Sequence, residues 1–212
     1  EIKSLIKAWF SKTDLYDTPQ KLNKLIDFFG SLNLPRTPLA ISMYLWILEN
    51  QENYKPINHA LMLENFIERL FKKHSKTELL SETFGYKNKE RLLTSIARKM
   101  YDENQINYRI ERKFLSDYID EYLKARRFEF DPEEVLQHFL DKGIFITEND
   151  NSSLYIRFKF TCFFQFFLMK NMEYDLSFKE HVLSEENFLF FINEIDYFTG
   201  IMRDRADILK LL

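Results

Sequence analysis

Three residues of different chemistry stand in succession at Arg36, Thr37 and Pro38, directly before a long apolar stretch. The hydroxyl of Thr37 can accept a hydrogen bond from an orphan amide in a first helical turn. Pro38 would then take the first helical position, where a missing N–H costs nothing. Apolar residues follow on more than one face, which predicts a helix over 38–49 buried on several sides. Two interpretations of Pro38 stay open: a boundary signal between helices, or part of the floor of a nucleotide pocket.

Other residue types that perform chemistry are poorly placed for it. The four histidines show no spacing typical of a metal site, so we expect no metal ligand among His59, His74, His138 and His181. The one cysteine, Cys162, lies in an apolar pattern and is expected to behave as a small hydrophobe. The sequence also lacks the Gly-x-x-x-x-Gly-Lys-Ser/Thr phosphate loop. We therefore expect no catalytic residue in this chain.

Composition narrows the class of protein further. The 212 residues include 22 phenylalanines but only four glycines and five prolines, which favours a mainly helical fold with an aromatic core. A formal net charge of −3 gives no basic excess for bulk nucleic-acid binding. No apolar run reaches the roughly 18 residues of a membrane span, so we expect no membrane association. The single cysteine, Cys162, excludes an internal disulfide and fits a reducing cytoplasm. The chain opens on Glu1 inside a helical pattern, so we expect a piece of a longer protein.

The first third of the chain has helical periodicity throughout. Apolar spacing predicts helices over 2–10, after Thr18-Pro19, over 38–49 and over 57–74. The connections between them are short enough for antiparallel neighbours. We therefore expect a four-helix bundle over residues 1–76.

The middle of the chain has a different pattern. A helix over 88–103 is followed by a short alternating strand over 106–110 and a helix over 111–124. Asp131-Pro132 then starts another helix, which Gly143 ends. Two strands around the polar tip 148–153 complete a hairpin. This order predicts a winged-helix domain over residues 87–160.

The last part of the chain, 161–212, is expected to be a helical extension. A nearly all-apolar helix over 160–172 must pack against neighbours on most sides. Two further helices are predicted over 185–198 and 204–212, with Gly200 between them.

The Pro38-Leu39 step resembles the short Pro-Leu motif in the helical lid of STAND signalling ATPases of the NACHT and NB-ARC types. A helical lid followed by a winged helix is also the order found in that family after its nucleotide-binding core. The resemblance implies that Pro38 packs against the adenine of ADP or ATP, in a nucleotide site that includes Thr37. Arg36 would supply a positive charge over the phosphates. A surface salt bridge is the other interpretation of Arg36.

Two later segments carry the same resemblance. The stretch from Tyr155 to Met169 is similar to the NACHT-type ending of the winged helix, with matches at Phe158, Phe163, Gln165, Phe166 and Phe167. Phe160 stands where the family often has a histidine near the nucleotide phosphates, and a phenylalanine ring cannot donate a hydrogen bond. The segment 194–203 also resembles bacterial STAND proteins, with no assigned role.

The resemblance implies a regulatory lid and winged helix that control activation of a nucleotide-switched ATPase, in bacterial signalling or antiviral defence. The phosphate cradle and the magnesium ligands would lie in an upstream nucleotide-binding core, and activation would permit homo-oligomerisation. Two alternatives stay open. A nucleic-acid-binding winged helix is disfavoured by the acidic helix 132–142 and by the acidic wing tip. A helical protein-interaction module without a nucleotide is the other.

Overall fold

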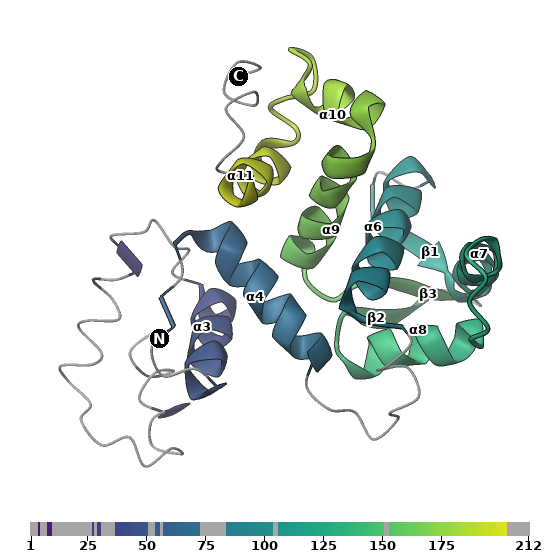
Figure 1. Ribbon diagram of the computed structural model, residues 1–212, viewed down its shortest axis with the longest axis horizontal. Helices are drawn as coiled ribbons and strands as arrows, with labels where there is room; N and C mark the ends of the chain where they lie inside the picture. The colour runs from purple at the N-terminus through teal and green to yellow at the C-terminus, as the bar shows by residue number, and fades with distance from the viewer. Residues whose placement is uncertain are drawn as a thin grey trace. The chain divides into compact units, whose positions relative to one another are not determined.

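The computed structural model describes residues 4, 8–9, 27, 29–30, 37–50, 54–55, 57–72, 84–103, 106–150 and 153–202. Within these residues it contains eight helices and three strands, so the fold is mainly helical with one small antiparallel sheet, as the composition predicts (Figure 1). The chain divides into two compact units, residues 1–70 with 200–203 and residues 71–199 with 204–212. The helices predicted over 2–10, after Thr18-Pro19 and over 204–212 fall almost wholly outside the described residues.

The first unit contains α3 (Pro38–Asn50) and most of α4 (His59–Lys72). Helix α3 starts as its sequence predicts, because the amide of Ala40 donates to the hydroxyl of Thr37 at 3.2 Å. Asn58 caps α4 in the same way, accepting from the amide of Leu61 at 2.9 Å. Both helices predicted in this region, over 38–49 and 57–74, are confirmed.

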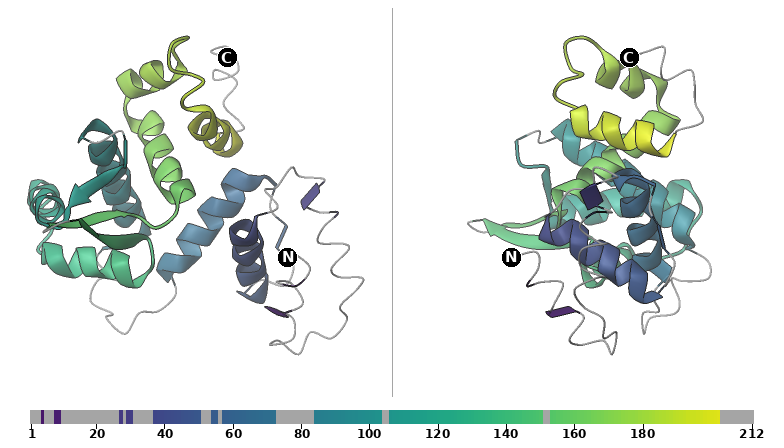
Figure 2. Two further views of the ribbon diagram at one scale, coloured as in Figure 1. Left: turned by 180° about the vertical axis from the view of Figure 1, so that it is seen from behind. Right: turned by 90° about the vertical axis from the view of Figure 1, so that its left-hand side faces the viewer.

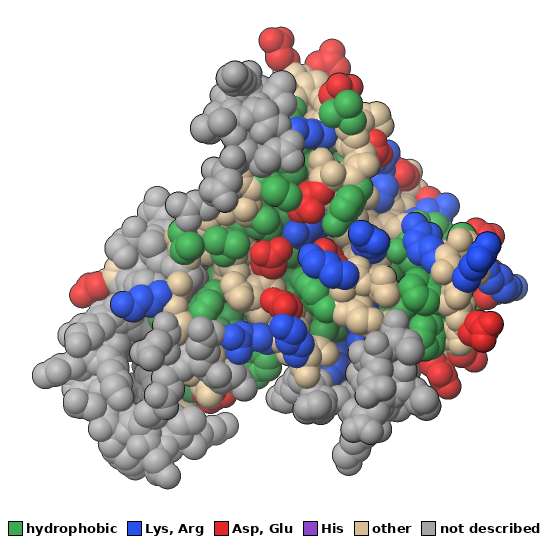
Figure 3. All heavy atoms as spheres, viewed as in Figure 1, with side chains coloured by type: hydrophobic (Ala, Val, Ile, Leu, Met, Phe, Trp, Pro, Cys, Tyr) green, Lys and Arg blue, Asp and Glu red, His purple; other side chains and the backbone are tan. Residues whose placement is uncertain are grey.

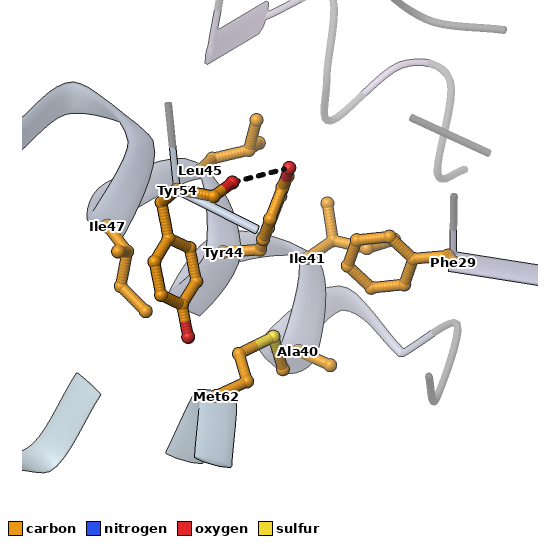
Figure 4. Packing of buried hydrophobic residues seen from close by; sticks show 8 residues of the cluster. All are labelled: Phe29, Ala40, Ile41, Tyr44, Leu45, Ile47, Tyr54 and Met62. Carbon is orange, nitrogen blue, oxygen red and sulfur yellow. Dashed lines mark hydrogen bonds between the residues drawn. The ribbon is translucent and has the colours of Figure 1, made fainter. Parts of the chain in front are cut away.

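An aromatic core holds α3 in place (Figure 4). The ring of Tyr44 lies 5.4 Å from that of Phe29, edge to face, and 6.1 Å from that of Tyr54. Its hydroxyl donates to the backbone carbonyl of Tyr54 at 3.5 Å. The buried cluster consists of Phe29, Ala40, Ile41, Tyr44, Leu45, Ile47, Tyr54 and Met62. Since these contacts come from several sides, α3 is buried on more than one face, as expected, and its rotation is fixed.

The second unit places one sheet among helices. Its elements are, in order, α6 (Tyr86–Glu103), β1 (Arg109–Glu111), α7 (Arg112–Ala125), α8 (Pro132–Asp141), β2 (Phe145–Asp150) and β3 (Ser153–Phe158). The strands are antiparallel in the order β1-β3-β2, with Ile110 opposite Ile156 and Phe145 opposite Phe158. The hairpin predicted after Gly143 is therefore confirmed.

Local signals explain where these elements begin and end. The side chain of Asp131 accepts from the amide of Glu133 at 2.7 Å and so caps α8, with Pro132 at the first helical position. Gly143 ends that helix in a left-handed conformation with φ +68°. The prediction of a strand over 106–110 is wrong in its position, since β1 spans Arg109–Glu111. Residues 106–107 form a turn, and Tyr108 has a positive φ of 47° that interrupts extended backbone.

Helix α9 (Thr161–Tyr174) is buried nearly all round and packs beside α6 (Figure 1). Phe163, Phe166, Phe167 and Met169 are each no more than 1% exposed. The rings of Phe158 and Phe167, stacked 5.7 Å apart, join this helix to the sheet. The prediction that this apolar helix packs on most sides is confirmed.

The C-terminal helices differ from the prediction. Helix α10 (Leu176–Leu183), capped by Asp175 through the amide of Phe178, was not expected. Residues 184–191 are turns, not the first half of a helix over 185–198, because the side-chain amide of Asn187 binds the hydroxyl of Ser184 and the carbonyl of His181. Helix α11 (Ile192–Ile201) follows, and Gly200 lies inside it rather than between two helices. Figure 2 shows α10 at the end of α9 remote from β3.

Candidate functional site

The sequence-predicted site lies at the start of α3. Thr37 and Pro38 are adjacent and exposed, and Leu39 is half-buried below them. The third predicted residue, Arg36, lies outside the described residues. The structure thus places two of the three residues at one end of a helix whose rotation the aromatic core fixes.

The start of α3 presents an exposed proline ring and a first turn without acidic side chains. The exposed ring of Pro38 is apolar and rigid, which suits the face of a purine base. The first turn of α3 contains no acidic residue that would repel an anionic ligand. The described residues contain no group of three or more His, Cys, Asp or Glu side chains arranged to hold a metal ion. An apolar ring of this kind is compatible with a contact to a base.

The three-stranded sheet carries a network of ion pairs that joins β1 and β3 to acids of β2. Arg109 lies 2.5 Å from Asp150 and 4.0 Å from Glu148, and its guanidinium stacks 4.4 Å from the centre of the Tyr155 ring. Arg157 donates to the same Glu148 carboxylate. Because both arginines are paired with acids of β2, these two side chains leave little positive charge for a phosphate backbone.

A shallow hollow of about 340 Å³ lies where α7 and α8 begin, lined by Arg112, Ser116, Asp117, Glu133, Ser153 and Leu154 among others. Arg112 pairs with Glu133 at 2.9 Å. A hydrogen bond from Ser116, together with Arg112, lowers the pKa of the Glu133 carboxyl. The hollow is thus already occupied by its own ion pair and offers no unpaired arginine.

The residue directly before α9 is the phenylalanine that stands where the family resemblance predicts a histidine. Phe160 precedes the helix without a side-chain cap, its ring 5.2 Å from that of Phe163 and 5.4 Å from the Lys159 ammonium. It donates no hydrogen bond to a ligand. Two residues later, burial raises the pKa of the Cys162 thiol to about 11, so the thiol stays protonated near neutral pH. Cys162 therefore behaves as the small hydrophobe that the sequence predicts.

Residues 108–168 match the family model described as Novel STAND NTPase 4. This stretch is a STAND NTPase-associated region. It runs from the start of β1 through α7, α8, β2 and β3 into α9, so the resemblance to STAND ATPases is confirmed for this part of the chain. The match associates the chain with a STAND NTPase and with nucleotide binding by such a protein.

No curated protein and no solved structure matches the chain. Among the described residues, none of the helices has the length and apolar character needed to cross a membrane.

Sequence reasoning missed the buried charged side chains among the described residues, of which two are informative. Lys89 is 4% exposed on α6, and Glu194 is 5% exposed on α11. A signal for Lys89 was available, because it lies three and four residues before the buried Leu92 and Leu93 and so belongs to the apolar face. Glu194 lies in the segment 194–203, for which the sequence predicts no role.

Proposed function

We propose that this chain is the regulatory part of a nucleotide-switched STAND ATPase, with a helical lid over 1–76, a winged-helix domain over 87–160 and a helical extension over 161–212. The observation that carries the proposal is the family match over residues 108–168. The arrangement of the elements supports the proposal. From α6 onward their order is helix, strand, helix, helix, strand, strand, and the strands of the sheet lie in the order β1-β3-β2. That order is typical of winged helices.

The mechanism we propose is a shift between two conformations. ADP or ATP, with magnesium, is bound by an upstream nucleotide-binding core and supplies the energy difference between the closed and open states. Pro38 contacts the adenine, Thr37 fixes the start of α3 beneath it, and Arg36 reaches toward phosphate. The nucleotide acts only through its different affinity for the two states. In the open state the chain permits homo-oligomerisation, in a cytoplasmic and bacterial signalling or antiviral-defence protein.

The test is nucleotide retention by the full-length protein carrying Pro38→Ala. The matched control is Pro132→Ala, because Pro132 also occupies the first position of a helix but belongs to the second unit. We expect Pro38→Ala to speed ADP release by about 10-fold, equivalent to about 1.4 kcal/mol, and Pro132→Ala to leave it unchanged. Equal release rates for the wild type and both variants would remove Pro38 from the site.

The first alternative is a winged helix that binds nucleic acid. On the face shown in Figure 3, Lys and Arg side chains are interspersed with Asp and Glu rather than gathered into one basic field. Arg109 and Arg112 are each paired with a carboxylate, on β2 and α8 respectively, which reduces the positive charge available to a nucleic acid. A salt-sensitive mobility shift of duplex DNA near physiological ionic strength would favour this alternative over the switch.

The second alternative is a helical protein-interaction module that never meets a nucleotide. The gene sequence upstream of Glu1 distinguishes this alternative from the switch. The switch requires a phosphate-loop motif there, within about the length of one domain. If no such motif is encoded there, the switch proposal fails.

A further inference from the structure

An exposed apolar segment follows α10 in the second unit. The side chains of Phe188, Leu189, Phe190 and Ile192 are 36%, 71%, 82% and 50% exposed, respectively. Exposed apolar side chains are usually scattered singly, whereas these lie close together in the sequence. Residues 188–192 are termed the apolar turn. A contiguous exposed apolar patch is typical of an interaction surface.

The apolar turn is held in one conformation by contacts on its inner side. Phe191 lies among the exposed residues but is itself 6% exposed, with its ring 5.6 Å from that of Tyr101. The side-chain amide of Asn187 donates to the hydroxyl of Ser184 at 3.0 Å. The backbone amide of Phe190 donates to the carbonyl of Asn187 at 2.8 Å. Because the turn is ordered before it meets a partner, binding costs it less conformational entropy.

The charges around the apolar turn have one sign. The segment 180–196 contains no lysine or arginine. Its exposed acidic side chains are Glu180, Glu185, Glu186 and Asp196. Two apolar turns that faced each other would bring like charges together, which disfavours a symmetric contact. The surface that complements this segment is instead both apolar and positively charged.

The end of α7 offers a surface of this kind within the same unit. Lys124, Arg126 and Arg127 are exposed there, and the half-buried rings of Phe128 and Phe130 follow them. The two rings lie 6.1 Å apart and remain partly accessible. Residues 124–130 are termed the basic surface. Its cations and aromatic rings match the acids and apolar side chains of the turn.

Arg127 is the cation of the basic surface that is most available to a partner. Lys124 already pairs with Asp120 at 2.5 Å, whereas Arg127 makes no ion pair within the part of the chain that the structure describes. Its backbone has a positive φ of 59° and ends α7, which places this exposed residue at the tip of the helix. Glu129 is the acid of this stretch, so three cations stand against one acid and the basic surface keeps a positive charge.

We propose that the apolar turn of one copy of this chain docks on the basic surface of a second copy. The aromatic side chains of the turn pack on Phe128 and Phe130, while Glu185 and Glu186 face Arg127. Aromatic anchors and arginine are the side chains that contribute most to binding in protein interfaces. Figure 1 shows α7 and the turns after α10 at separate edges of the second unit, so one molecule can use both surfaces at once.

The contact joins two different surfaces and is therefore heterologous. Such contacts continue from copy to copy and produce rings or filaments, whereas a symmetric contact stops at a dimer. The inference rests on the proposed function in one respect, because it names the surfaces through which the proposed homo-oligomerisation takes place.

The test uses the full-length protein, whose molar mass is measured by light scattering after size-exclusion chromatography, with ATP and with ADP. We expect the wild type with ATP to form assemblies of more than two copies. Phe190→Ser and Arg127→Glu should each weaken association about 10-fold or more, the loss typical of an interface anchor. Since both residues are exposed, neither change should lower the midpoint of thermal unfolding.

Mixing the two variants gives the sharpest result. The Arg127→Glu chain keeps an intact apolar turn, and the Phe190→Ser chain keeps an intact basic surface. Together they should form a dimer with one copy of each, which cannot grow further. Arg127→Lys retains the positive charge and should still assemble.

Two matched controls come from the first turn of α7. Phe114→Ser removes an aromatic side chain that is 64% exposed, and Lys113→Glu reverses an exposed cation. Both residues lie outside the apolar turn and the basic surface, so both variants should assemble as the wild type does.

The outcomes separate this interface from the nucleotide switch. If Phe190→Ser and Arg127→Glu assemble normally, or if their mixture stays monomeric, the interface is overturned, although ATP-dependent assembly would keep the switch. If mixing restores a dimer but assembly is the same with ADP and ATP, the interface stands and the switch is contradicted. A wild type that stays monomeric with either nucleotide overturns the interface, and the switch is then judged by ADP release from Pro38→Ala.

Discussion

Asn58 donates a hydrogen bond from its side-chain amide to the backbone carbonyl of Gly200 at 2.8 Å, which joins residues 142 positions apart in the first unit. A Cβ atom on Gly200 would lie 2.9 Å from the Cβ of Ala60 and 3.4 Å from the amide group of Asn58. The start of α4 and the last turn of α11 therefore touch because residue 200 has no side chain.

Gly200→Ala should destabilise the first unit by about 1–3 kcal/mol, because the new methyl group overlaps Ala60 and pushes the Asn58 hydrogen bond apart. Chemical denaturation measures the change. Gly85→Ala is the control, since a Cβ there meets nothing within 4 Å. If both variants unfold at the same denaturant concentration, the close approach at Gly200 does not contribute to stability.

Thr37→Ala should destabilise α3 by about 1 kcal/mol, because the amide of Ala40 loses its side-chain acceptor. Thr37→Ser keeps the hydroxyl and should remain within a few tenths of a kcal/mol of the wild type. Urea unfolding followed by circular dichroism at 222 nm provides the comparison. Equal losses in the two variants would mean that the methyl group of Thr37, not the cap, matters.

His138 should make stability fall on acidification. Its pKa is lowered from 6.5 in the unfolded chain to about 4 in the fold, so between these values the unfolded state binds more protons. The contribution is fully present above pH 6.5 and is lost as pH falls toward 4. In His138→Gln, the free energy of unfolding should depend less steeply on pH in this window. An unchanged slope would mean that folding does not lower the pKa of His138.

Glu194 should act in the opposite direction. Burial raises its pKa from 4.5 to about 7, and its Oε2 atom has no hydrogen-bond partner among the residues that the structure describes. The folded state therefore binds the extra proton between these values, so stability is fully present below pH 4.5 and is lost as pH rises through 7. Glu194→Gln, which is neutral at every pH, should be more stable than the wild type at pH 8 and similar to it at pH 4.5. A pH-independent difference would contradict the titration.

Features set by neighbouring residues could be predicted from the sequence. The caps at Thr37 and Asp131 and the stop at Gly143 each depend on side chains or backbone within a few positions, and all three appear as expected. The hairpin was predictable for the same reason, because its strands flank a polar tip. Such local signals are sufficient to predict α3, α8 and the β2–β3 hairpin from the sequence.

Features set by distant contacts could not be predicted. Glycine usually ends helices, so the sequence predicts a helix break at Gly200, but its close approach to Ala60 depends on a residue from the other end of the chain. Alternation predicts a strand at Tyr108, whereas this residue has a positive φ and its ring stacks on that of Phe164 at 4.3 Å. In the candidate site, Pro38 could be placed at the start of α3, whereas the exposure that makes it available depends on the whole unit.

Gly143→Ala should destabilise the second unit by about 1–2 kcal/mol, for a reason different from that at Gly200. A Cβ on Gly143 would come no closer than 3.6 Å to the Lys159 side chain, which is an ordinary contact. The cost is therefore the left-handed conformation itself, with φ +68°. Gly143→Asn should recover part of the loss, because asparagine tolerates this region better than alanine. Thermal unfolding of both variants measures the ranking; if asparagine is no better than alanine, the loss comes from crowding at Lys159 and not from the backbone.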